Sequence, residues 1–426
     1  MENNNLKLKV RLLVMNFLQF AVWGAYLTSM GSYLVNVGLA ENISWFYAIQ
    51  GIVSIFMPAL IGIISDRWIP AQRMLGLCHF LAAVFMGGAA FYGLNGGQEV
   101  EFSGLFTLYS LSVAFYMPTL ALSNSVAYSA LEGAKMDTVI HFPPIRVFGT
   151  IGFICAMIAV DFLGYQNTYM QFLVSAGLSL VLAVYAQTLP PCAVSSGAQA
   201  DGGHKSVTEA LGLRAFTLFR EKKMAYFFIF SFLLGVSLQI TNGYANPFIQ
   251  SFSAVDAYKG LYFVEHANQL ISLSQMSETL CILLIPFFLH RYGIKNVMLI
   301  AMFAWVLRFG FFAVGNPGSG VWLFILSMIV YGVAFDFFNV SGSLFVDKET
   351  DPAIRSSAQG LFMIMTNGLG ATAGSLCAGE VINRFVYSRP MEEQLAGWST
   401  SWFIFSAYAL VVGVLFALLF KYKHEK

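Results

Sequence analysis

The sequence predicts an all-α membrane protein with twelve transmembrane helices in two six-helix bundles, and three observations support this fold class. Of the 426 residues, 58% are hydrophobic and only 11% are charged, which leaves too few charges to cover a soluble surface of this size. Apolar runs long enough to cross a bilayer recur along the chain. One long polar break divides these runs into two sets of six.

The predicted spans follow from the lengths of the apolar runs. A bilayer core of about 30 Å takes about 20 helical residues to cross, and twelve suitable runs are separated by short polar breaks. In the fifth run, Pro143 and Pro144 mark either a kink or the start of the helix. The runs lie at residues 10–35, 43–65, 74–94, 104–130, 138–163, 167–188, 224–250, 264–290, 296–315, 320–346, 357–381 and 398–420.

The polar segments predict how the chain begins and divides. Residues 1–11 are polar and basic, and no small-residue cleavage pattern follows the first run, so we expect that run to remain in the protein. The longest break, 189–223, is predicted to be a cytoplasmic linker between an N-terminal bundle (1–188) and a C-terminal bundle (224–426). Within the linker, residues 207–219 have apolar residues at helical spacing, and we expect them to lie on the membrane surface.

The distribution of charge predicts orientation and excludes one class of partner. With both termini in the cytoplasm, eighteen Lys and Arg residues fall in inner segments and only Lys259, Arg384 and Arg389 fall in outer ones. The net charge of +1 supplies no concentrated basic surface for a nucleic acid. The five cysteines are far apart and mostly inside apolar runs, so we expect neither a disulfide framework nor a metal site.

Two acids, Glu278 and Asp336, lie near the midpoints of apolar runs. At about 1.5 Å per helical residue, Glu278 is about 18 Å along the helix from His266. An ionisable group at this depth is costly unless it faces protein or water. The alternative role is that of a structural acid paired with a base on a neighbouring helix. Because acids are rare in membrane spans without a function, we predict that one of the two carries a proton across the membrane.

Aromatic and amide side chains accompany these acids. Tyr331 and Phe335 are four residues apart and form one ledge, which can hold a planar ring by stacking, although such pairs are more often packing. Gln275 shares a helix face with Glu278. In the seventh run, the amides of Gln239 and Asn242 also share a face, where they either bind a neutral polar solute or hold helices together.

The first half offers a second polar stripe. Arg146, Thr150 and Phe153 follow one another at helical spacing on the fifth run. Arg146 can anchor a substrate carbonyl, balance the charge of an acid, or extend to the membrane interface; we favour the first two. Arg308 and His79 also lie within predicted spans, and we interpret them as structural or gating partners rather than ligand contacts.

These features predict ion-coupled transport. Neither a phosphate-binding Walker loop nor a zinc-binding helix motif is present in the sequence, and residues 368–370 (GLG) lack the strand context of a dinucleotide site, so we interpret them as close helix packing. The amides and acids suit a sugar or oligosaccharide equally well, which leaves a sugar symporter as the alternative. A membrane sensor or an intramembrane enzyme is less consistent, because neither a signalling domain nor a nucleophile with its base is evident.

Several stretches carry a resemblance to a known family. Residues 62–67 (GIISDR), with Arg73, resemble the loop signature of the major facilitator superfamily, in which two six-helix halves rock about a central site. Within that superfamily the chain is similar to the nucleoside:proton symporter family. The similar stretches are 17–34 (FLQFAVWGAYLTSMGSYL), 56–68 (FMPALIGIISDRW), 142–153 (FPPIRVFGTIGF), 238–242 (LQITN), 274–298 (SQMSETLCILLIPFFLHRYGIKNVM) and 328–349 (MIVYGVAFDFFNVSGSLFVDKE).

The resemblance implies proton-coupled import of nucleosides by alternating access across the cytoplasmic (inner) membrane of a bacterium. It implies no cofactor beyond the coupled proton, and the expected partners are a nucleoside, protons and the lipid bilayer, with the chain acting as a monomer and not as an enzyme. It places the nucleoside site between the two halves. Proton coupling at Glu278 or Asp336 is predicted separately, from the depth of these acids in their spans. The implied nucleoside contacts are Arg146, Thr150, Phe153, Gln239, Asn242, Gln275, Glu278, Tyr331 and Phe335.

Overall fold

The computed structural model describes residues 2–192, 213–351 and 354–422, and the regular secondary structure of these residues is entirely helical. The chain divides into two compact units, each of which is described separately. The first unit comprises Met1–Leu39 and Ile52–Ala210, and the second comprises Ala40–Gly51 and Leu211–Lys426. The break between the units along the chain falls inside residues 189–223, where the sequence predicts the linker.

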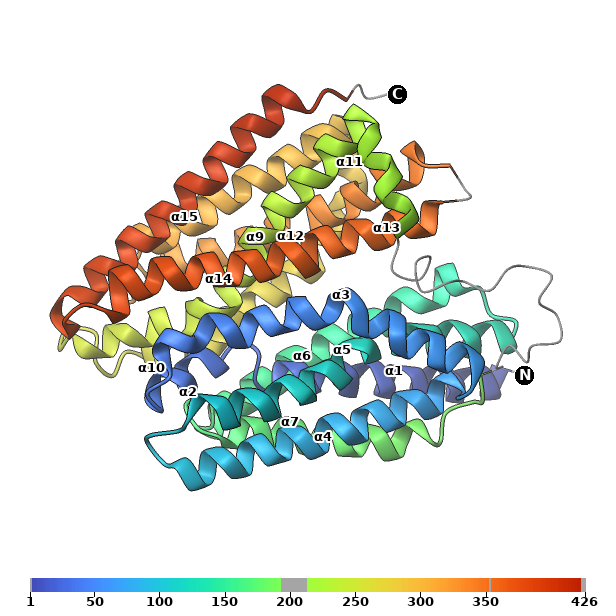
Figure 1. Ribbon diagram of the computed structural model, residues 1–426, viewed down its shortest axis with the longest axis horizontal. Coiled ribbons are helices and arrows are strands. Elements are labelled where there is room, and N and C mark those ends of the chain that lie inside the picture. Colours follow the sequence, from blue (N-terminus) through green and yellow to red (C-terminus); the bar gives the residue numbers. More distant parts are fainter. Residues whose placement is uncertain (1, 193–212, 352–353, 423–426) are drawn as a thin grey trace. The chain divides into compact units, whose positions relative to one another are not determined.

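The first unit is a bundle of long helices (Figure 1). The first predicted span is broken by turns at residues 25–29 into α1 and α2, and Pro143 and Pro144 lie inside α6 rather than at its start. The helices of this unit are α1 (Glu2–Gly24), α2 (Met30–Asn36), the later part of α3 (Ile43–Arg67), α4 (Ala71–Gly96), α5 (Phe102–Gly133), α6 (Thr138–Phe162) and α7 (Met170–Ala186).

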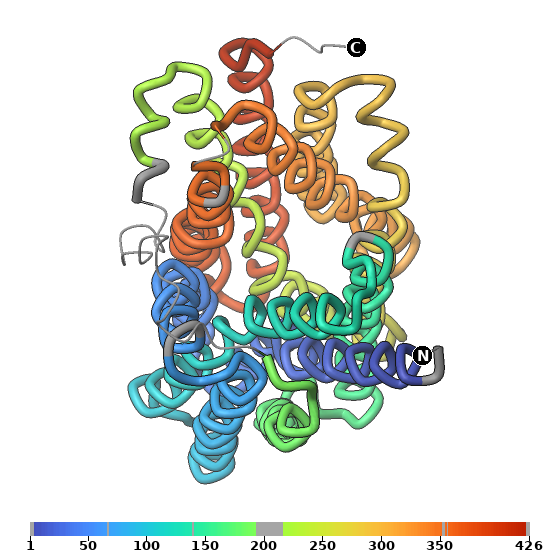
Figure 2. The backbone as a smooth tube through the Cα atoms, turned by 90° about the vertical axis from the view of Figure 1, so that its right-hand side faces the viewer, coloured from blue at the N-terminus to red at the C-terminus, as the bar shows by residue number. Residues whose placement is uncertain are grey.

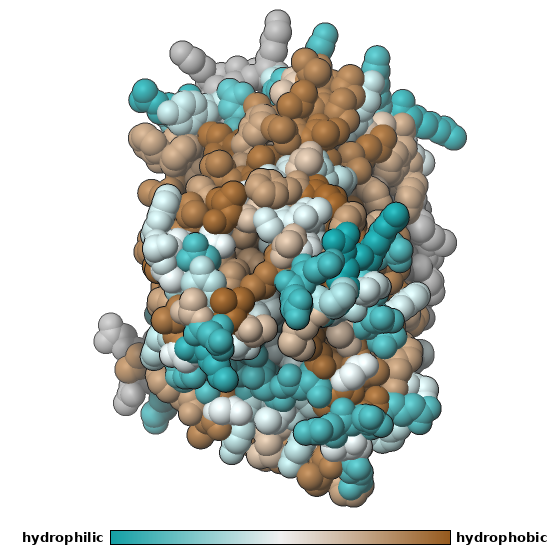
Figure 3. Space-filling view, turned by 90° about the vertical axis from the view of Figure 1, so that its left-hand side faces the viewer, coloured by the Kyte–Doolittle hydropathy of each residue, from teal (hydrophilic) through white to brown (hydrophobic). Residues whose placement is uncertain are grey.

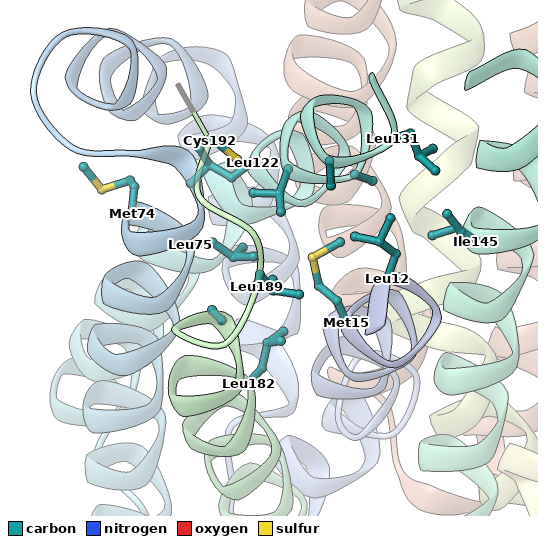
Figure 4. Close-up of a cluster of buried hydrophobic side chains, with 14 of the residues drawn as sticks. Leu12, Met15, Met74, Leu75, Leu122, Leu131, Ile145, Leu182, Leu189 and Cys192 are labelled. Carbon is teal, nitrogen blue, oxygen red and sulfur yellow. The ribbon is translucent and has the colours of Figure 1, made fainter. Parts of the chain in front are cut away.

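Apolar side chains from these helices form the core of the first unit. Figure 4 shows Leu12 and Met15 of α1 close to residues of α4, α5 and α7, and Leu12, Met15, Leu75 and Leu182 are each 0% exposed. The α1–α6 contact is closer still, because a Cβ atom added at Gly152 would lie 2.1 Å from the carbonyl oxygen of Phe17. Glycine therefore allows the backbones of α1 and α6 to touch, which fixes the position of α6.

The second unit contains the remaining helices (Figure 1). Its elements are α9 (Lys222–Ser251), α10 (Tyr262–Glu265), α11 (Ala267–Val314), α12 (Val321–Glu349), α13 (Arg355–Met363), α14 (Ala371–Ile382) and α15 (Met391–Leu419), with the 3-10 turns η2 (Leu213–Arg220) and η3 (Phe252–Ala254) and the π-helical turns η4 (Ile364–Gly370) and η5 (Asn383–Tyr387). Leu213–Arg220 covers the end of the predicted surface segment 207–219, whose first part lies outside the described residues.

The long helix α11 is two spans joined by a bend. Gly293 has φ 75° and ψ 168°, a backbone conformation that favours glycine, so the two predicted spans at 264–290 and 296–315 meet at this residue. Figure 2 shows the two arms, coloured yellow to orange, meeting at the bend. The earlier arm carries Gln275 and Glu278, and the later arm carries Arg308. Each arm packs against α12, and the contact between α11 and α12 is the most extensive helix contact in the unit.

Small residues also bring backbones together in the second unit. A Cβ atom added at Gly370 would lie 2.7 Å from the carbonyl oxygen of Phe232, and one added at Gly374 would lie 2.0 Å from that of Val236. Gly370 and Gly374 thus pack η4 and α14 against α9, which supports the interpretation of this glycine-rich segment as close helix packing.

The start of α3 belongs to the second unit, whereas the sequence places all of residues 1–188 in the N-terminal bundle. Asn383 Nδ2 donates a hydrogen bond to the carbonyl oxygen of Glu41 at 2.9 Å, and Ser44 packs against Gly379. Gly51 likewise packs against Thr372 and the carbonyl of Gly368. These contacts join distant parts of the chain, so the pattern of apolar residues along the sequence does not reveal them.

Each predicted span has a helix in the structure. Among the described residues, nine helices are long and apolar enough to cross a membrane, and α11, which contains two predicted spans, counts as one of them. The apolar helix Met170–Ala186 is shorter, and α1 covers most of the first predicted span. Figure 3 shows hydrophilic side chains interspersed with hydrophobic ones on the surface that faces the viewer.

Candidate functional site

The aromatic ledge of the second unit is formed as its spacing predicts. The rings of Tyr331 and Phe335 on α12 are stacked, with centroids 5.7 Å apart and an interplanar angle of 15°. Tyr331 is only 6% exposed, and Trp305 of α11 approaches its ring edge-on at 6.0 Å. Phe335 is half-buried, so one member of the stack is anchored in the protein while the other presents accessible surface.

Both predicted proton-coupling acids lie close to this ledge. The Tyr331 hydroxyl interacts electrostatically with Glu278 and Asp336, and it forms a hydrogen bond with the side chain of Gln275. Asp336 is 5% exposed, whereas Glu278 is half-buried. The structure thus brings Gln275, Glu278, Tyr331 and Asp336 together from α11 and α12, as expected for a titrating group beside a ligand contact.

The two amides on α9, Gln239 and Asn242, are hydrogen-bonded to each other. The Nδ2 of Asn242 donates a hydrogen bond to the Oε1 of Gln239 at 2.8 Å. Both side chains are half-buried. This bond uses one N–H of Asn242 and the carbonyl oxygen of Gln239, so it does not use the NH₂ group of Gln239 or the carbonyl oxygen of Asn242.

In the first unit, the predicted polar stripe lies beside an aromatic cluster on α1 and α5. The Cζ of Arg146 lies 4.2 Å from the centroid of the Phe20 ring, a cation–π contact, and Arg146 also interacts electrostatically with Tyr116. Phe153 meets Trp23 edge-on at 6.4 Å. Arg146 and Thr150 are half-buried and Phe153 is buried. The guanidinium of Arg146 and the hydroxyl of Thr150 are therefore partly accessible, beside aromatic side chains that pack α6 against its neighbours.

His79 is the centre of a buried hydrogen-bond network in the first unit. Its Nδ1 is 2.8 Å from Ser179 Oγ and its Nε2 is 2.8 Å from Gln19 Oε1. Gln19 Nε2 in turn donates to Thr119 Oγ1 at 2.7 Å. His79 is 0% exposed and joins α1, α4, α5 and α7, which agrees with its predicted structural role.

Sequence reasoning missed the partners of these residues. Gln19, Ser179 and Phe20 were not selected, although Gln19 and Phe20 fall in one of the stretches similar to the family. Their partners are 60 to 126 positions away and lie on other helices, and a single sequence carries no signal for such pairing. For Gln19 and Ser179, the available signal in the sequence was a polar residue inside an apolar run.

The fold and these groups define the class of protein. Two bundles of apolar helices, with acids and aromatics buried inside the spans, are typical of a membrane transporter of the major facilitator type. Among the described residues, no group of three or more His, Cys, Asp or Glu side chains could hold a metal ion.

Comparisons with known proteins give the family. The family model described as nucleoside H⁺ symporter matches residues 6–425, so the chain belongs to this family. The nucleoside permease NupG of Escherichia coli K12 is 45% identical over 424 residues, which cover 99% of this chain and 98% of the relative. The xanthosine permease of the same organism is 45% identical over 423 residues, with 99% and 97% covered.

A solved structure supports the same relationship. The crystal structure of an aspartate-to-alanine mutant of NupG has a TM-score of 0.90 to this chain at 45% identity and covers 97% of this chain and 100% of its own. The chain therefore has the fold of the major facilitator superfamily and is a permease-type protein rather than an enzyme.

Proposed function

We propose that this protein imports nucleosides together with protons across the cytoplasmic membrane of a bacterium by alternating access. The observation that carries the proposal is the match of residues 6–425 to the nucleoside H⁺ symporter family. The cluster of Tyr331, Phe335, Gln275, Glu278 and Asp336 in the second unit supplies the chemistry that such an activity requires.

The nucleobase stacks on the Tyr331–Phe335 ledge. A purine or pyrimidine ring is planar and neutral. Stacking on an aromatic face stabilises any base by about 1–3 kcal/mol and does not depend on which polar groups the base carries. The half-buried Phe335 supplies the accessible ring, and the buried Tyr331 ring stacks on Phe335 and supports it. Gln275, Gln239 and Asn242 then bind the ribose hydroxyls and the base edge, because amides donate and accept hydrogen bonds.

The first unit contributes a separate set of contacts. We assign Arg146, Thr150 and Phe153 to nucleoside binding because they match the family's contacts and because α6 presents them from a packed base. Arg146 is suited to donate to a base carbonyl, and Thr150 is suited to either a carbonyl or a hydroxyl.

A proton on Glu278 or Asp336 couples transport to the proton gradient. Protonation neutralises the acid, which removes the cost of enclosing a charge in an apolar cavity when the loaded site closes. Coupling requires that proton and nucleoside each bind one arrangement of the protein more tightly than the other, because equal affinity shifts no equilibrium. The half-buried Glu278 and the buried Asp336 both contact the neighbourhood of Tyr331, so either charge acts directly on the ledge.

The orientation and assembly complete the proposal. The excess of Lys and Arg in alternate segments supports an orientation with both termini and the 189–223 linker in the cytoplasm. The chain acts as a monomer in the inner membrane, with the proton as the coupled ion and without a resident cofactor.

Uptake into proteoliposomes tests the function. Purified protein is reconstituted, an inside-alkaline pH gradient is imposed, and entry of radiolabelled uridine is followed together with acidification of the lumen. We expect uphill accumulation that disappears when the gradient is collapsed. Downhill movement alone, without lumenal acidification, would refute proton coupling.

The same assay separates the sugar-symporter alternative. We expect unlabelled nucleosides to compete with uridine, and hexoses or disaccharides at the same concentration to leave uptake unchanged. Competition by sugars with equal strength would favour the alternative function instead.

A further inference from the structure

Arg308, on the later arm of α11, is a buried cation that the proposed mechanism leaves without a role. It is 2% exposed, and a charged side chain inside a membrane span is costly unless the protein uses it. Its Nη1 donates a hydrogen bond to the backbone carbonyl of Ser327 at 2.7 Å and lies 3.4 Å from Ser274 Oγ. Its Nε is buried without a hydrogen-bond partner among the described residues, so hydrogen bonding alone does not explain its position.

The guanidinium of Arg308 lies close to two aromatic rings. Its Cζ is 4.5 Å from the centroid of the Tyr331 ring and 5.5 Å from that of Phe312. A planar guanidinium is well suited to this arrangement, because it can stack flat on an aromatic face while its edge donates hydrogen bonds. Tyr331 therefore has Arg308 as one neighbour and the stacked ring of Phe335 as another.

The hydrogen bonds of Arg308 end on the helical turn that carries Tyr331. Ser327 precedes Tyr331 by four residues, and in an α-helix its carbonyl is also the acceptor for the Tyr331 backbone N–H. Ser327 Oγ donates back to the carbonyl oxygen of Arg308 at 3.0 Å. The two residues thus form a reciprocal clamp between α11 and α12 at the base of the ledge.

We infer that Arg308 is a positioning residue for nucleoside binding: it holds the Tyr331 ring, and through it the Tyr331–Phe335 stack, in the orientation that receives the base. The inference rests on the proposed function and extends it to a residue that does not contact the nucleoside. Arg308 acts only through Tyr331, so its effect on affinity depends on the presence of the Tyr331 ring.

A double-mutant cycle on the purified full-length protein tests this dependence. Binding of uridine is measured by isothermal titration calorimetry for the wild type, Arg308→Met, Tyr331→Leu and the double variant. We expect Arg308→Met to weaken binding about tenfold in the wild-type background, which corresponds to about 1.4 kcal/mol. In the Tyr331→Leu background, the same substitution should change the affinity by less than about twofold, because the ring that it positions is gone.

Two further variants control for loss of structure. Arg308→Lys keeps a positive charge beside the ring and should recover part of the affinity, so it tests the inference even where Arg308→Met does not fold. Asn268→Ala removes another buried polar side chain of α11, whose partner is Asn246 at 2.8 Å, and should leave uridine affinity within about twofold of the wild type.

The outcomes separate this inference from the proposed function. If the wild type binds no nucleoside, the proposed function fails and the role of Arg308 fails with it. If the wild type binds but Arg308→Met weakens binding equally in both backgrounds, or Arg308→Lys and Arg308→Met both bind like the wild type, Arg308 does not act through Tyr331 while the proposed function stands.

Discussion

The contact between α1 and α6 gives the sharpest test of the structure, through the substitution Gly152→Ala. A Cβ atom at residue 152 would lie 2.1 Å from the carbonyl oxygen of Phe17, whereas ordinary contact begins at 3.4 Å, so the two helices must part by about 1.3 Å there. The same contact includes Gly24, where a Cβ atom would lie 2.3 Å from the carbonyl oxygen of Phe153. Both neighbouring atoms belong to backbone, which cannot rotate away.

Inserting one methyl group into a well-packed contact costs about 1–3 kcal/mol. Because Phe153 packs on Trp23 and Arg146 packs on Phe20 across the same contact, parting the helices should also displace two proposed nucleoside contacts. We therefore expect Gly152→Ala to lower the thermal midpoint of the purified protein in detergent and to raise the KM for uridine uptake.

The matched control is Gly177→Ala on α7. A Cβ atom there has no atom within 4 Å among the described residues, and the position is exposed. Alanine should therefore leave the free energy of unfolding unchanged or raise it by at most about 1 kcal/mol through its helix propensity, and the thermal midpoint should not fall. Equal midpoints and equal KM values for the two variants would show that α1 and α6 do not approach as closely as the structure has them.

Three further predictions concern the proposed coupling acids, the aromatic ledge and the network of His79. Glu278→Gln should abolish proton-driven accumulation of uridine while downhill exchange continues, because the substitution keeps the shape and hydrogen bonds of the side chain but removes its titration; Asp336→Asn tests the second acid in the same uptake assay. Phe335→Leu should weaken binding of purine and pyrimidine nucleosides alike by about 1–3 kcal/mol, measured by calorimetry, because stacking does not distinguish bases. His79→Phe should lower the thermal midpoint, because Gln19 Oε1 loses its partner and costs about 1–3 kcal/mol as an unsatisfied buried group, whereas Ser179 Oγ keeps its hydrogen bond to the backbone carbonyl of residue 79.

Each of these has a result that contradicts it. Full uphill uptake by both acid variants would remove Glu278 and Asp336 from the coupling mechanism. Unchanged affinity of Phe335→Leu would show that the base does not stack on the ledge. A His79→Phe protein with the wild-type midpoint would mean that the buried network contributes nothing to stability.

The positions of the membrane spans along the chain could be predicted from the sequence, because the bilayer imposes a length and a hydrophobicity on every span. Apolar runs of sufficient length mark each helix, and the bend at Gly293 falls where a short polar break separates two of them. Residues three or four apart on one helix could also be paired, because helical spacing fixes their common face. For this reason the stack of Tyr331 on Phe335 and the position of Gln275 beside Glu278 followed from spacing alone.

The tertiary structure alone decided which helices meet and through which atoms. The network of His79 joins residues 60 and 100 positions away, the start of α3 packs on α14 more than 300 positions later, and the guanidinium of Arg308 reaches a ring on a different helix. In a chain where nearly every helix is apolar, periodicity does not say which face meets which neighbour. That choice depends on the shapes of small residues and on the few polar partners available at each depth, and both become defined only when the helices are packed.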